Sequence, residues 1–161
     1  MTPPLLPVAA QRSTACVAMT ASRIGADKLT QLETLVTKLE SEAAHESFDV
    51  WHSLHREFHR LIVSEAGATT VAEMELLVLR SERYQSAYQG AHLTGWWQRG
   101  EAEHRALFEA ISDHNAALAG DLAGRHLART ALELLAALAP EFDTSRLRSA
   151  LRFVSEGTRS F

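Results

Sequence analysis

Residues 101–139, EAEHRALFEAISDHNAALAGDLAGRHLARTALELLAALA, are the stretch that decides the fold class. The stretch is rich in Ala, Leu, Glu and Arg, which are good helix formers, and it contains no proline. Asn115 is a suitable cap for a helix that begins at Ala116 and that Pro140 ends. The stretch therefore predicts two helices, over residues 101–113 and 116–139.

The same helical pattern extends over most of the chain. No proline lies between residues 8 and 139, and no alternation of polar and apolar residues predicts a strand. Apolar residues at helical spacing predict three further helices, over residues 28–44, 47–66 and 71–88. Joined by short loops, these helices predict an all-α, antiparallel bundle of about six helices.

The chain divides into three predicted parts. Residues 1–24 are expected to be a leader that is poorly ordered or holds a short helix near 8–20. Residues 25–140 form the predicted helical domain, in which an irregular piece between the helices contains Trp96 and Trp97. Residues 141–161 are expected to be a tail that can add one short helix.

Composition excludes several classes of protein. The 161 residues suit one domain, and a net charge of −4 argues against a chain built mainly to hold nucleic acid. A single cysteine, Cys16, cannot form an internal disulfide, which favours a reducing, cytoplasmic location. No apolar run approaches the roughly 20 residues of a membrane span, and the N-terminus lacks the basic start of a signal peptide.

Histidine is the unusual residue in this composition. His55 and His59 are four residues apart and share one helix face, whereas His104 and His126 lie on the apolar stripes of two other predicted helices. A buried neutral imidazole needs partners for both ring nitrogens or loses about 1–3 kcal/mol. One metal ion would satisfy a nitrogen of each ring, so a shared metal site and separate hydrogen-bonded core histidines are both open interpretations. Of the other four, His52 is a possible substitute ligand, and three are expected to be solvated: His45, His92 and His114.

Enzyme motifs fit less well. The string HREFH at 55–59 is not the zinc-protease HExxH, because its glutamate is one place too late. EAEH at 101–104 supplies one Glu-x-x-His, and a di-iron bundle needs two. A metalloenzyme of hydrolase type remains the alternative function, with Glu101 or Glu103 as the general base beside His104.

Three segments carry a family resemblance. LHREFHRLIVSEAG at 54–67, EAEHRALFEAI at 101–111 and LAGRHLART at 122–130 resemble, in order, the signature segments of the FCD domain. This is the effector domain of FadR-subfamily GntR-type bacterial transcription regulators. The resemblance covers about residues 25–140.

The resemblance implies a non-catalytic sensor. Members are helical bundles with a central cavity, where many hold a divalent metal through one aspartate and three histidines. A small organic acid binds beside the metal and alters how a dimer presents its winged helix-turn-helix domains to DNA. His59, His104 and His126 match the three histidines, and His55 stands where the aspartate is usual.

The replacement at position 55 has two possible outcomes. Four imidazoles would favour zinc, with nickel possible, and would leave the full charge of the ion to attract an anion. Alternatively, loss of the carboxylate leaves a weak or metal-free site. Arg80 is the preferred carboxylate-binding residue, with Tyr84 beside it. The resemblance also implies a homodimer. The roughly 25 residues before the first confident helix are too few for a winged helix-turn-helix, so this chain alone is not expected to bind DNA.

Overall fold

The computed structural model describes residues 5–45, 48–77, 96–145 and 148–149. All regular structure in these ranges is helical, which confirms the predicted all-α bundle. Residues 68–77 form a helical stretch, and five helices are complete: α1 Leu5–Arg23, α2 Ala26–His45, α3 Phe48–Leu61, α5 Trp96–Ser112 and α6 Ala116–Leu138. None of the described helices is both long enough and apolar enough to cross a membrane.

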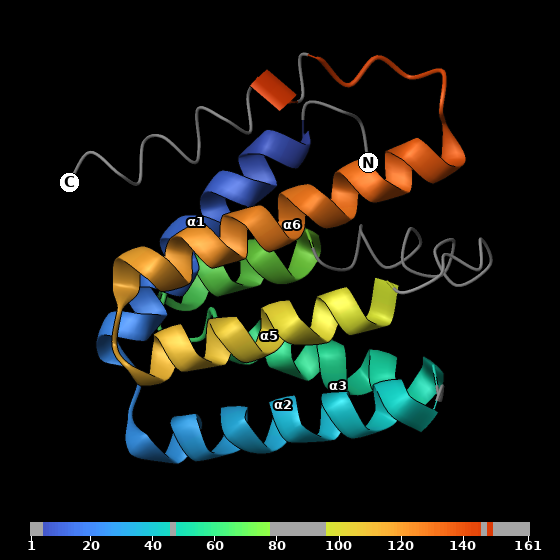
Figure 1. The fold of residues 1–161 in the computed structure, drawn as a ribbon. Coiled ribbons are helices and arrows are strands. Elements are labelled where there is room, and N and C mark those ends of the chain that lie inside the picture. Colours follow the sequence, from blue (N-terminus) through green and yellow to red (C-terminus); the bar gives the residue numbers. More distant parts are fainter. Residues whose placement is uncertain (1–4, 46–47, 78–95, 146–147, 150–161) are drawn as a thin grey trace.

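Helix α5 occupies the centre of the arrangement. It packs against α6 and α1 on one side and against α2 on the other, and α2 also packs against α3 (Figure 1). The tightest association joins α1 and α6, which lie at opposite ends of the described sequence. The first and last complete helices of the described sequence therefore pack against each other.

Large apolar side chains fill the space between α2, α3 and α5. Their spacing of three or four residues along each helix places them on one inward face. The side chains with 0% exposure in this layer are Leu32, Val36 and Leu39 of α2, Phe58 of α3, and Leu107 and Ile111 of α5. Burial of this layer removes a large apolar area from water and so stabilises the bundle.

Helix α1 corrects the expectation of a poorly ordered leader. The expected short helix near residues 8–20 is a 19-residue helix whose Val17 is fully buried. Helix α1 packs closely against two glycines of α6, Gly120 and Gly124. A Cβ atom at Gly120 would lie 2.8 Å from the carbonyl oxygen of Thr14, and one at Gly124 would lie 2.5 Å from the Thr14 hydroxyl, so a larger residue at either position would clash. The contact face of α1 is made of small residues, so no stripe of large apolar side chains revealed it in the sequence.

Helix ends follow the sequence signals in part. The predicted cap is confirmed, because the Asn115 side chain accepts a hydrogen bond from the backbone N–H of Leu118. Helix α5 begins at Trp96 rather than Glu101, so the expected irregular piece is wrong where it includes Trp96 and Trp97. Helix α3 ends at Leu61, and turns lead to Gly67, whose φ of 93° is one that glycine adopts without strain.

Candidate metal centre

Four imidazoles meet between α3, α5 and α6. His55 and His59 come from α3, His104 from α5 and His126 from α6. One ring nitrogen of each lies within 4.8 Å of the corresponding nitrogen of every other ring. The sequence placed these residues on inward helix faces, and the packing of three helices brings them to a common point.

Helical spacing on α3 produces the closest pair. Because His55 and His59 are one turn apart, their Nε2 atoms lie only 3.0 Å from each other, within hydrogen-bond distance. The ring of His55 also stacks on Trp51, one turn earlier, at 4.5 Å between centroids. The His55 ring is thus held between an indole and a second imidazole.

His104 lies deepest in the cluster and is 1% exposed. Neither of its ring nitrogens has a hydrogen-bond partner in the part of the chain that the structure describes. The nearest acceptor, Oε1 of Glu101, is 3.6 Å from Nδ1, beyond normal hydrogen-bond distance. A buried polar nitrogen without a partner costs about 1–3 kcal/mol, and an ion at the centre of the cluster would remove part of that cost.

Burial keeps the imidazoles neutral. It lowers the pKa of His55 and His104 well below the usual value of 6.5, and the neighbouring imidazoles lower each of them further. For the same two reasons the pKa of His59 falls to about 3. Neutral imidazole is the form that binds metal ions, so at pH 7 these rings are ready ligands.

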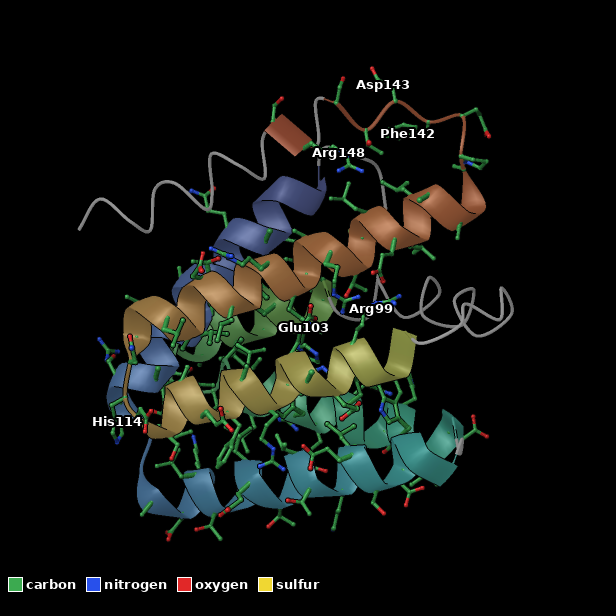
Figure 2. All side chains as sticks on the ribbon, in the orientation of Figure 1. Arg99, Glu103, His114, Phe142, Asp143 and Arg148 are labelled. Atoms are coloured by element: carbon green, nitrogen blue, oxygen red, sulfur yellow. The ribbon has the colours of Figure 1, made fainter. Side chains whose placement is uncertain are left out.

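Two carboxylates of α5, those of Glu101 and Glu103, lie next to imidazoles of the cluster. Oε2 of Glu103 is 2.5 Å from Nδ1 of His126, and Arg129 donates two hydrogen bonds to the same carboxylate. Burial acts to raise the pKa of Glu103, but these hydrogen bonds lower it to about 2. Figure 2 shows Glu103 between α5 and α6.

The second carboxylate, Glu101, is held by Trp51. The indole Nε1 donates a hydrogen bond of 2.8 Å to Oε1 of Glu101, while Oε2 has no partner among the described residues. Burial raises the pKa of Glu101 to about 7, although the hydrogen bond from Trp51 acts in the opposite direction. The sequence had singled out both glutamates, but only as general bases, and it gave no sign of their partners Trp51 and Arg129.

A family comparison agrees with this geometry. The model of the FCD domain family matches residues 14–129, which include all four histidines. This chain belongs to the FCD domain family. FCD domains are the ligand-binding, sensing domains of GntR-family regulators, which confirms the resemblance carried by the three sequence segments. No curated protein matches the sequence.

A cavity opens beside the cluster of this FCD domain. It has a volume of about 510 Å³ and lies between α1, α3 and the helical stretch 68–77. His59, the one cluster histidine with partial exposure, lines it together with polar and apolar side chains that include Ser53, Arg56, Arg60, Met74 and Glu75. A small molecule in the cavity would therefore reach the cluster through His59.

The other residues singled out in the sequence lie elsewhere. Arg80, Tyr84 and His92 fall outside the described residues. His52 is half-buried on α3 and is not one of the four clustered rings. His114 is exposed in the turn before α6, where its Nδ1 lies 2.8 Å from the carbonyl oxygen of Ala21.

The donor set of the cluster suits a divalent metal. Zinc–nitrogen bonds of about 2.0–2.1 Å place the nitrogens of a tetrahedral site about 3.3 Å apart, so nitrogens within 4.8 Å of one another need only small ring rotations. Imidazole ligands suit zinc, nickel, copper and iron. His55, His59, His104 and His126 are the residues that would hold the metal, and the ion would supply positive charge that attracts an anionic ligand.

Proposed function

We propose that this FCD domain binds a divalent metal through His55, His59, His104 and His126 and uses the loaded site to sense a small organic acid. The observation that carries the proposal is the convergence of four imidazoles from three helices, in which both ring nitrogens of buried His104 lack partners among the described residues. Separate core histidines would each be expected to have a hydrogen-bond partner of their own. A shared metal ion would account for the convergence of the four rings.

Zinc is the proposed metal, with nickel as the alternative. The four donors are uncharged nitrogens, which favour these ions over magnesium or calcium. The donors also bring no negative charge, so a bound ion keeps its full positive charge. That charge would attract an anionic effector to the cavity lined by His59, and we propose that Arg80 and Tyr84 help to hold the acid there.

The wider role follows from the family. We propose that the domain belongs to a bacterial FadR-subfamily regulator, works in the cytoplasm as a homodimer, and controls a winged helix-turn-helix domain rather than binding DNA itself. The family supports sensing over catalysis. Light scattering of the purified chain tests the dimer.

Metal analysis tests the central proposal. Protein purified without chelators is expected to contain one divalent ion per chain. Zinc at a free concentration about 1,000 times its Kd is expected to stabilise the metal-free fold by about 4 kcal/mol. His59→Ala is expected to abolish this stabilisation, whereas His52→Ala, on the same helix but outside the cluster, should retain it. Absence of bound metal together with no thermal shift on adding zinc would remove the proposal.

Calorimetry with small dicarboxylates and hydroxy acids tests the effector. Zinc-loaded protein is expected to bind one of these acids more tightly than metal-free protein does, because the ion supplies the attraction. Arg80→Ala is expected to weaken that binding tenfold or more without loss of the fold. Equal affinity in the variant removes Arg80 from the site.

A hydrolytic metalloenzyme is the second candidate, and buried Glu101 is the observation that favours it. This carboxyl group has a raised pKa of about 7 and lies beside His104, as a general base would. Against it, four histidines close a tetrahedral shell, whereas catalytic zinc keeps an open position. Turnover of a panel of esters and amides by the zinc-loaded protein would decide in favour of the enzyme.

A further inference from the structure

Glu103 is the carboxylate in hydrogen-bond contact with a ring of the cluster. Its Oε2 atom lies 2.5 Å from Nδ1 of His126. A carboxylate that also accepts two hydrogen bonds from a guanidinium is ionised and can only accept. Nδ1 of His126 must therefore carry a proton, so Nε2 is the nitrogen left to offer a lone pair to a metal.

Arg129 fixes the carboxylate in turn. Its Nε donates to Oε1 of Glu103, and its Nη2 donates to Oε2 at 2.6 Å, so the two planar groups meet in parallel. Nη1 of Arg129 also donates to Glu133 at 2.7 Å, one turn later on α6. Arg129 lies one turn after His126, so the ion pair ties the histidine-bearing segments of α5 and α6 together at the cluster.

The other three rings lack such support among the described residues. Nδ1 of His104 is 3.6 Å from Glu101 and has no hydrogen-bond partner. His55 and His59 contact each other through the same Nε2 atoms that would face an ion. His126 is thus the ring whose metal-facing nitrogen is selected before any metal arrives.

We propose that Glu103, clamped by Arg129, is a positioning residue that holds His126 as the Nδ1–H tautomer and directs its Nε2 into the metal centre. The proposal rests on the proposed metal site. None of the four proposed ligands is a carboxylate. In this proposal the carboxylate of Glu103 does not bind the metal but orients one ligand, His126, through a charge-assisted hydrogen bond. Partners of this kind typically contribute 10–100-fold to metal affinity.

Zinc affinity provides the first test, by competition with a chromophoric chelator on the full chain. Glu103→Gln is expected to weaken zinc binding about 10–100-fold. Glu133→Gln is the matched control, because it removes the same charge from the same arginine without touching an imidazole. The control is expected to change affinity by less than about fivefold, as for a partly exposed ion pair. Equal losses in the two variants, or no loss in Glu103→Gln, overturn the proposal.

The tautomer of His126 in metal-free protein provides the second test. Two-bond ¹⁵N–¹H correlation spectra distinguish the tautomers, and the His126 signals are identified by their absence in His126→Gln. The Nδ1–H form is expected in the wild type, and a mixture of tautomers is expected in Glu103→Gln. An Nε2–H form in the wild type overturns the positioning role. If the wild type binds no zinc, the metal site fails, and the tautomer alone still decides whether Glu103 orients His126.

Discussion

Two layers of side chains share helices α3 and α5 but differ in how far their polar atoms are satisfied. The imidazole layer consists of His55, His59, His104 and His126, and the apolar layer consists of Leu32, Val36, Leu39, Phe58, Leu107 and Ile111. On α5 the two layers are one turn apart: His104 is 1% exposed and Leu107 is 0% exposed. The apolar layer needs only van der Waals contact, whereas the imidazole layer contains buried nitrogens that have no partner among the described residues.

The two layers have opposite effects on the stability of the metal-free bundle. Burial of apolar side chains is favourable in proportion to the area removed from water. Burial of an unpaired imidazole is unfavourable, and only a ligand can make it favourable. The same helix therefore stabilises the fold with Leu107 and, one turn earlier, carries His104 of the proposed metal site.

The largest expected effect is a loss of the apolar layer. Leu107→Ala is expected to lower the free energy of unfolding by about 2–5 kcal/mol, because the buried leucine leaves a cavity. The loss should be similar with and without zinc, measured by urea unfolding in both conditions. Leu118→Ala, at a leucine with 45% exposure, is the control and should change stability by less than about 0.5 kcal/mol. A Leu107→Ala loss that appears only with zinc would mean that the layers are not separate.

A smaller effect of opposite sign is expected in the imidazole layer. His104→Leu is expected to stabilise the metal-free protein by about 1–3 kcal/mol, because it removes two unpaired buried nitrogens from a site of similar volume. The same variant should lose the stabilisation by zinc. Thermal unfolding with zinc or with a chelator measures both changes.

Leu107→His is the mirror-image variant for this comparison. It places an imidazole one turn away, within the buried apolar core, so it should destabilise the protein with and without zinc. A His104→Leu variant that is less stable than the wild type in chelator would show that the imidazole layer is already satisfied without a metal.

The smallest expected effect is the response of the metal-free protein to mild acid. The pKa values of His55, His59 and His104 are lower in the fold than in the unfolded chain, so the unfolded chain takes up more protons below pH 6.5. Their contribution to stability is present above pH 6.5 and is lost as the pH falls. Glu101 acts in the opposite direction, because its pKa of about 7 in the fold is above its unfolded value.

As the pH falls through this range, the stability lost through the three histidines is larger than the stability gained through Glu101. The net loss from about pH 7.5 to about pH 6 is expected to be on the order of 1 kcal/mol. Urea midpoints at the two pH values measure it in chelator, and Leu107→Ala should show the same dependence as the wild type. A metal-free protein that becomes more stable over this interval would contradict the assignment of neutral, buried imidazoles.

Local sequence determined the helices and their inward faces. Helix formers, the Asn115 cap and Pro140 predicted α6 almost to the residue, and helical spacing placed His55 beside His59. These properties depend on interactions within about one turn of the chain, so one sequence contains them. The fold class and the inward positions of the four histidines on their helices were therefore predictable.

Tertiary structure alone decided which faces meet. The length of α1 was underestimated because small residues pack it against Gly120 and Gly124, and small residues give little periodic signal. The pairing of Glu103 with His126 and Arg129 depends on the relative register of α5 and α6, which no local pattern records. Sequence fixes each helix face through short-range geometry, whereas the convergence of separate faces on one point is settled by packing across the whole bundle.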